Sequence, residues 1–272
     1  MLRRFWSIAF WAGFALSLPV FFAVAVALWL VTAPFDARRR ASHYFSCAWA
    51  AFYVWIYPGW RVAVVGRRHI VPGRAYVLVA NHTSVADIVL CFMLFRQFKW
   101  VSKRSVFNLP FLGWNMWMCR YVPLVRGDGA SIERMLDTCR VWLRRGMSVM
   151  MFPEGTRSAD GAVKPFKHGA FTLALETGVP VVPVAIHGGA DLIPKHGRTF
   201  APRADLRIEV LEPVAPDGFA SAAAYGEAVR AHVCAALGQP VAPAADASSA
   251  APACASPPAS ASTPTATAAA GP

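Results

Sequence analysis

The N-terminal part of the chain contains the feature that most restricts the fold, an apolar run without a formal charge between Phe5 and Phe35. At about 1.5 Å of rise per residue, a helix over this run exceeds the about 30 Å of a membrane hydrocarbon core. Arginines flank it on both sides, at Arg3-Arg4 and at Arg38-Arg39-Arg40, so charge gives no orientation. We predict a membrane-associated helical element over residues 1–58.

Three structures are compatible with this element. The first is a single transmembrane helix. The second is a helix pair that dips into one leaflet, with the aromatic-rich segment from His43 to Tyr57 as its second member, ended by Pro58-Gly59. The third is a cleaved signal peptide, because Ala23-Val24-Ala25 resembles a cleavage site; the apolar run continues past that site, which disfavours this interpretation.

The overall charge narrows the possible partners. The chain carries 27 Lys and Arg against 15 Asp and Glu, a net charge of +12, and its mean hydropathy is +0.40. A basic protein attracts nucleic acid or an anionic membrane. The sequence shows no nucleic-acid motif and no basic helix interleaved with base-stacking aromatics. We therefore predict membrane lipid, and no nucleic acid, as the partner.

The six cysteines form no CxxC pair. This spacing predicts buried, reduced thiols in a reducing compartment, without a metal site or a disulfide framework. We accordingly place the domain that follows the N-terminal element on the cytosolic side of an inner or cytoplasmic membrane.

After Pro58, short apolar strands alternate with helices. This alternation predicts an α/β layered domain over residues 59–238 with a mixed, partly parallel sheet. From Gln239 to the end the composition is mainly Ala, Pro, Ser and Thr, with almost no charge or large apolar residue, which predicts a disordered tail over residues 239–272. The predicted strands span 61–66, 76–80, 100–102, 121–125, 148–152, 181–186 and 206–211, and the predicted helices span 85–95, 131–145, 169–176 and 220–237.

A histidine and an aspartate five residues apart, His82 and Asp87, follow the second predicted strand. Five residues place side chains on separated faces of a helix, so these two meet only if the chain turns between them. A turn with Thr83 or Ser84 as N-cap, followed by a helix from about Val85, brings them together. Asp87 would then orient His82 as a general base. A turn histidine and a helix-capping acid fit the same pattern. No GxSxG motif occurs, so a catalytic His82 would activate a hydroxyl of the substrate.

A second polar segment, Glu154-Gly155-Thr156-Arg157, follows the strand that ends at Phe152-Pro153. Arg157 suits a bidentate contact to phosphate, and Glu154 suits the orientation of that arginine or of a backbone amide. Lys103 and Arg126 each end a predicted strand and would add positive charge to the same site. A structural turn and solvated cations are the alternatives. The intervening segment, residues 108–114, suits either an acyl-chain groove or core.

Taken together, these segments resemble the glycerophospholipid acyltransferase family, in particular its 1-acyl-sn-glycerol-3-phosphate acyltransferases. Departures after Lys103, where Arg104-Ser105-Val106 stands, and at His187-Gly188 leave the acyl donor and the head group open. The matching segments are NHxSxxD at Asn81, His82, Ser84 and Asp87; a lysine and PxxGW at Lys103 and 110–114, followed by 122–126; FPEGTRS at 152–158; and VPVVPVAI at 179–186.

The resemblance implies a glycerolipid-acyltransferase-like fold behind an N-terminal hydrophobic helix or helix pair. It also implies acyl transfer from acyl-CoA or acyl carrier protein to the 2-hydroxyl of lysophosphatidic acid, which forms phosphatidic acid in phospholipid biosynthesis. His82 and Asp87 would be catalytic, the 154–157 turn with Lys103 and Arg126 would bind phosphate, and no cofactor would be needed. Another lysolipid acceptor, or lipid binding without catalysis, remains an alternative.

Overall fold

The computed structural model describes residues 2–57, 59–193, 197 and 199–241. Its compact unit, residues 1–242, contains helices, strands and two 3-10 turns in an order that alternates after the first two helices. The elements are α1 (Leu2–Thr32), α2 (Arg40–Trp55), β1 (Trp60–Val65), η1 (Arg67–His69), β2 (Val77–Ala80), α3 (Ala86–Phe92), β3 (Phe98–Lys103), η2 (Arg104–Asn108), α4 (Leu112–Met118), β4 (Val122–Leu124), α5 (Gly129–Arg144), β5 (Ser148–Met151), α6 (Gly169–Thr177), β6 (Val181–His187), α7 (Gly189–Leu192), β7 (Ala204–Val210) and α8 (Ala222–Ala236).

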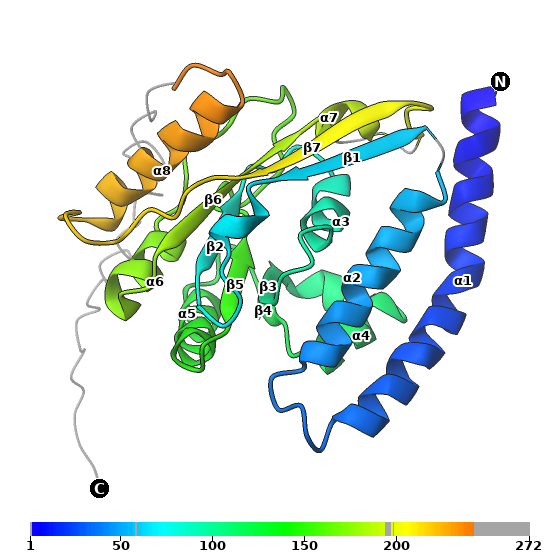
Figure 1. Ribbon diagram of the computed structural model, residues 1–272, viewed down its shortest axis with the longest axis horizontal. Helices are drawn as coiled ribbons and strands as arrows, with labels where there is room; N and C mark the ends of the chain where they lie inside the picture. The colour runs from blue at the N-terminus through cyan, green and yellow to red at the C-terminus, as the bar shows by residue number, and fades with distance from the viewer. Residues whose placement is uncertain (1, 58, 194–196, 198, 242–272) are drawn as a thin grey trace, which may run out of the picture. The chain divides into compact units, whose positions relative to one another are not determined.

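The strands form one sheet in the order β1-β7-β6-β2-β5-β3-β4 (Figure 1). Only β6 and β7 pair antiparallel, and the other neighbours are parallel. The predicted mixed, partly parallel sheet is therefore confirmed. Since β6, β2, β5, β3 and β4 all run the same way, their carboxyl ends meet at one edge, which is the usual place for a site in such sheets.

Each face of the sheet is covered by its own apolar cluster. In β2 the side chain of Leu78 packs on the side of α3, while Val77 and Val79 pack on the side of α5, α6 and α8, as the period of two in a strand requires. Figure 1 shows α5, α6 and α8 on one side of the sheet and α1, α2 and α3 on the other. The strands β2, β5 and β6 are thus buried on both faces, which explains why they are apolar almost throughout.

The N-terminal element consists of two helices that lie side by side (Figure 1). The ring of Phe21 in α1 stacks on Trp49 in α2 with centroids 5.4 Å apart, and the hydroxyls of Ser17 and Tyr53 lie 2.7 Å apart. The aromatic segment therefore forms the predicted second helix. By length and composition α1 could cross a membrane, and only 6% of its most apolar stretch is buried. A single span or a pair within one leaflet stays a prediction.

Two local features differ from the sequence prediction. The helix predicted over 85–95 ends at Phe92; the amides of residues 93–95 bond three residues back instead of four, and Phe95 takes a positive φ of 46°. The segment predicted as groove or core contains a helix, α4, that presents Trp114 to solvent. Gly113 lies so close to the carbonyl of Phe107 that a Cβ would overlap it, which explains the glycine at this position.

The cysteines that the structure describes are buried and free, at positions 47, 91, 119, 139 and 234. Cys254 and the predicted tail from residue 242 onward lie outside the described residues, and the domain boundary at residue 58 stays a prediction.

Candidate active site

The turn after β2 brings His82 and Asp87 together. The Nδ1 atom of His82 lies 2.9 Å from Oδ2 of Asp87, which is in the first turn of α3. The same Oδ2 accepts hydrogen bonds from the backbone amides of Thr83 at 2.7 Å and Ser84 at 2.8 Å. A carboxylate held by two amides at a helix start is fixed in position. It can therefore fix the tautomer and orientation of the imidazole.

The start of α3 differs in detail from the sequence prediction. Val85, not Thr83 or Ser84, occupies the N-cap position, and no side chain caps there. The hydroxyl of Ser84 instead accepts from the amide of Ala86 at 3.2 Å and donates to the carbonyl of Ile193 at 2.8 Å. Ser84 thus ties the turn to the segment that follows α7.

The imidazole of His82 is held by an aromatic ring stacked on its face as well as by its hydrogen bond to Asp87. Its ring stacks on Phe152 with centroids 3.9 Å apart and planes 8° apart, and Phe152 packs in turn on Trp100. The side chain of His82 is 9% exposed and that of Asp87 is fully buried. Within the described part of the chain, Nε2 of His82 has no hydrogen-bond partner. One ring nitrogen is therefore anchored, while the other is free to meet a substrate.

Glu154 joins the two motif segments. Its Oε1 accepts the backbone amide of His82 at 2.7 Å, and its Oε2 accepts the amide of Lys164 at 3.3 Å. Burial raises the pKa of Glu154 to about 7, and the two amides partly offset this rise. The amide of Ser158 donates to the carbonyl of His82 at 2.7 Å, a second link. Of the two roles predicted for Glu154, the structure shows the orientation of a backbone amide.

Two lysines that the sequence analysis did not single out shape the turn at residues 154–157. The Nζ atom of Lys164 donates to the carbonyl of Arg157 at 3.0 Å and lies 3.4 Å from the hydroxyl of Thr156. Gly155 has a positive φ of 73°, and a Cβ there would lie 2.9 Å from Cε of Lys167. In the sequence, the signal for these two lysines is that they lie three residues apart shortly after the 152–158 segment.

The predicted phosphate-binding cations lie at the carboxyl edge of the sheet. Lys103 is the last residue of β3, Arg126 follows β4, and Arg157 is in the turn after β5. Lys103 and Arg126 are exposed and Arg157 is half-buried. Among the residues the structure describes, none of these three side chains has a hydrogen bond or an ion pair. They are therefore available to an anion, and their joint role in phosphate binding stays a prediction.

Gly189, at the start of α7, is a further residue that the sequence analysis missed. It packs against Asp87, whose Oδ1 is buried without a hydrogen-bond partner in the described chain. A Cβ at this position would overlap Oδ1, so only glycine leaves the carboxylate where it is. Asn81 links the same region, since its side chain bonds both the amide and the carbonyl of Ile186.

Comparison with known proteins agrees with this arrangement. The acyltransferase family model matches residues 61–187. A 1-acyl-sn-glycerol-3-phosphate acyltransferase of Chlamydomonas reinhardtii is 40% identical over 196 residues, covering 71% of this chain and 58% of the relative. A chloroplastic 1-acyl-sn-glycerol-3-phosphate acyltransferase of Brassica napus is 38% identical, covering 66% of this chain and 52% of the relative. The chain thus spans little more than half the length of these curated relatives.

A solved structure is similar over nearly its full length. The crystal structure of the 1-acyl-sn-glycerophosphate (LPA) acyltransferase PlsC of Thermotoga maritima superimposes with a TM-score of 0.71 at 26% identity, covering 87% of this chain and 96% of that one. The region that the family model matches contains β2 to β6 and both motif segments described above, while β7 follows it. Residues 61–187 thus match the acyltransferase family, and the relatives that the chain resembles are 1-acyl-sn-glycerol-3-phosphate acyltransferases.

Proposed function

We propose that this chain transfers a fatty acyl group from acyl-CoA or acyl carrier protein to the sn-2 hydroxyl of 1-acyl-sn-glycerol-3-phosphate, forming phosphatidic acid. The observation that carries the proposal is the buried pair of His82 and Asp87, in which Nδ1 is anchored at 2.9 Å and Nε2 has no hydrogen-bond partner among the described residues. The names of the relatives support the choice of lysophosphatidic acid as acceptor.

The chemistry requires one base and no cofactor. Nε2 of His82 takes the proton of the acceptor hydroxyl as its oxygen attacks the thioester carbonyl, and Asp87 stabilises the imidazolium that forms. The tetrahedral intermediate then collapses, the carbon–sulfur bond breaks, and the imidazolium returns its proton to the leaving thiolate. A thiol is a good leaving group, so no acyl-enzyme is needed. General-base catalysis of this kind contributes about 10²–10⁴-fold.

The positively charged side chains at the carboxyl edge of the sheet are the candidates for binding the acceptor phosphate. We assign the direct phosphate contact to Arg157, which the turn at Gly155-Thr156 places, and a longer-range attraction for the phosphate to the charges of Lys103 and Arg126. Arg157 comes from the same turn that bonds the backbone of His82, through Glu154 and Ser158. In lysophosphatidic acid the phosphate and the reacting hydroxyl are close neighbours. A phosphate-binding Arg157 near the general base His82 therefore suits this acceptor.

The N-terminal helices suit a reaction in which acceptor and product both reside in a bilayer. The surface of α1 is largely apolar and exposed. Burial of such a surface in lipid is favourable, at about 25 cal/mol per Å². We propose that α1 and α2 hold the site at the membrane, with the catalytic domain in the cytosol.

The proposal is tested by acyl transfer with the detergent-purified full chain, comparing wild type with His82→Ala. The exposed His232 of α8 provides a matched control, His232→Ala. We expect phosphatidic acid formation by wild type and by the control, and none above about 1% in His82→Ala, since the general base is lost. Retained activity in His82→Ala rules out the mechanism.

The acceptor assignment needs a panel of lysolipids, assayed with both donors. Transfer only to another lysolipid would contradict lysophosphatidic acid and keep the mechanism. Thioester hydrolysis without an acceptor would indicate a hydrolase, and lipid binding without turnover would indicate a binding protein. In Arg157→Ala we expect the KM for lysophosphatidic acid to rise more than the KM for the donor; equal effects would contradict the phosphate contact.

A further inference from the structure

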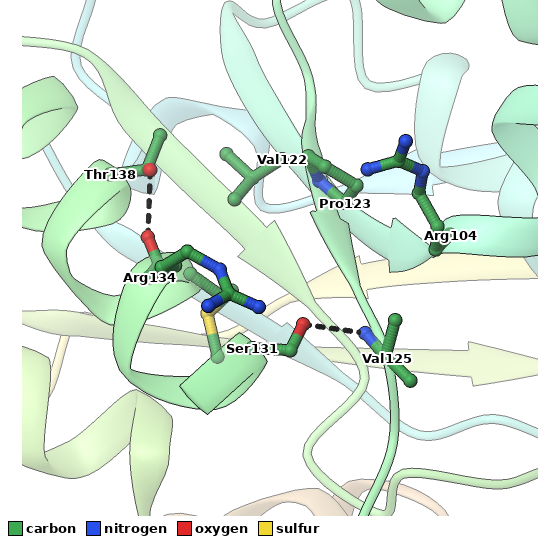
Figure 2. Close-up of a pocket in the computed structure, with 8 residues that line it drawn as sticks. Arg104, Val122, Pro123, Val125, Ser131, Arg134 and Thr138 are labelled. Atoms are coloured by element: carbon green, nitrogen blue, oxygen red, sulfur yellow. Dashed lines mark hydrogen bonds between the residues drawn. The ribbon is translucent and has the colours of Figure 1, made fainter. Parts of the chain in front are cut away.

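A cavity of about 270 Å³ opens beside β4, the edge strand of the sheet (Figure 2). One wall is a stripe of α5 formed by Ser131, Arg134 and Thr138, and the other wall is β4 itself. Arg104, the first residue after β3, lines the cavity from a third element. The volume is several times the about 30 Å³ that one water molecule occupies, so the cavity accommodates a phosphate group.

The two arginines of this cavity are only weakly engaged by the protein. The guanidinium of Arg104 lies 5.1 Å over the ring of Trp117 and has no acceptor among the described residues. Arg134 lies 4.0 Å from Asp128, with both side chains exposed, which makes a weak ion pair. Figure 2 shows Arg104 and Arg134 on either side of Val122 and Pro123. The cavity therefore has positive charge from two directions.

A hydroxyl group adds a donor between these charges. Ser131 accepts the amide of Val125 at 2.9 Å, and its own O–H has no acceptor among the residues that the structure describes, so it can donate to a ligand. It lies in the first turn of the 16-residue helix α5, where the helix dipole favours an anion. The carboxylate of Asp128 faces the same turn, but its Oδ1 already accepts the amide of Ser131 at 3.1 Å. Two guanidinium groups and a hydroxyl are a set of donors that suits a phosphate.

The distance from the cavity to His82 excludes the acceptor phosphate as its occupant. The strands β2, β5, β3 and β4 lie next to one another in this order. Met150 of β5 pairs with Leu78 of β2 and with Trp100 of β3, and the next residue of β3, Val101, pairs with Val122 of β4. Three strand spacings separate β2 from β4, so the cavity, which lies on the α5 side of the sheet, is at least about 14 Å from the end of β2. In lysophosphatidic acid only two carbons and one oxygen separate the reacting hydroxyl from phosphorus. A phosphate in the cavity therefore belongs to another reactant.

The acyl donor has a phosphate at the required distance. Its phosphopantetheine arm is about as long as four extended residues and spans about 14 Å from sulfur to phosphate. We propose that Arg104, Arg134 and Ser131 bind the phosphate that ends this arm, a group that CoA and acyl carrier protein share. This inference rests on the proposed function, because it assumes that a thioester meets the acceptor at His82. It assigns the two substrate phosphates to two places along the sheet edge.

Charge-neutralising variants of the full chain test this assignment. The variants are Arg104→Gln, Arg134→Gln and their combination, and Arg144→Gln is the matched control, since Arg144 is exposed on the same helix outside the cavity. Each cavity variant should raise the donor KM about fivefold, with acyl-CoA and with acyl carrier protein alike, from the loss of a charge-assisted hydrogen bond. The KM for lysophosphatidic acid and the melting temperature should stay unchanged.

Calorimetric binding of CoA to the same proteins gives a readout that needs no turnover. We expect CoA to bind wild type and Arg144→Gln equally and the cavity variants more weakly. Unchanged CoA binding and donor KM in the double variant would overturn the assignment, as would a rise in the acceptor KM instead. An effect on CoA alone would show that the cavity recognises the nucleotide rather than the shared phosphate. Wild type that binds CoA at the cavity and transfers nothing would refute the proposed function alone.

Discussion

Replacing Gly189 with alanine should disable acyl transfer although Gly189 contacts no substrate in the proposed mechanism. Gly189 packs against the buried Oδ1 of Asp87, and its own φ lies outside the left-handed region, so the backbone accepts alanine. A Cβ at this position would overlap Oδ1 and lie 3.1 Å from the hydroxyl of Thr83. The added methyl group therefore acts on the carboxylate that orients His82.

The magnitude follows from the space available. An ordinary contact of a Cβ needs at least 3.4 Å, so the carboxylate of Asp87 must withdraw by about 1 Å. Its Oδ2 is bonded to Nδ1 of His82 at 2.9 Å and to two backbone amides, so a shift of this size breaks the alignment. A misplacement of about 1 Å costs on the order of 10²-fold in rate. We expect kcat to fall about 100-fold with both KM values nearly unchanged.

The assay is thiol release from acyl-CoA in the presence of lysophosphatidic acid, with the melting temperature measured in parallel. Gly129→Ala is the matched control, because a Cβ on this first residue of α5 meets no atom within 4 Å. A Gly189→Ala protein with the kcat of wild type would refute the reasoning, even if its melting temperature fell, since the strain would then be relieved without moving Asp87.

Three further predictions concern the pH dependence of stability, the N-terminal connection and the tail. Burial raises the pKa of Glu154 to about 7 from 4.5, so its contribution to stability is complete below about pH 4.5 and is lost as the pH rises through about 7. The difference in unfolding free energy between wild type and Glu154→Gln should change by up to about 3 kcal/mol over this window, and a constant difference would contradict the burial argument. The buried Lys99 donates to the carbonyls of Arg38 and Cys119 at 2.8 Å and 2.7 Å, so Lys99→Met should lower the free energy of unfolding by about 1–3 kcal/mol in denaturant titrations; an equally stable variant would show that these bonds are replaced by water. Deletion of residues 241–272 should leave the transfer rate unchanged, and a large loss would mean that the tail takes part in the reaction.

Much of the fold follows from local pattern. The helix predicted over 131–145 appears as α5, because its apolar residues repeat at the helical spacing and face one cluster. The strand before the FPEGTRS segment appears as β5 in the middle of the sheet, because a strand buried on both faces is apolar throughout. Gly178 ends α6 in the left-handed conformation, as its place after the apolar run indicates.

Part of the candidate site was also visible in the sequence. His82 and Asp87 are only five residues apart, so a turn between them was enough to predict that the two side chains can meet, although Val85 rather than Thr83 or Ser84 occupies the N-cap position. The start of α4 was not visible, because it depends on a positive φ at Phe111 and on the close approach of Gly113 to η2.

The sequence by itself determined the apolar N-terminal element, the alternation of strands and helices, and the residues of the two motifs, since each of these depends on neighbours within a few positions. Only the tertiary structure decided that Phe152 supports the imidazole, that Glu154 bonds the backbone of His82, and that Gly189 confines Asp87. These contacts join residues about seventy to one hundred positions apart. They depend on which strands become neighbours, and strand order is set by the packing of the whole sheet rather than by any local pattern.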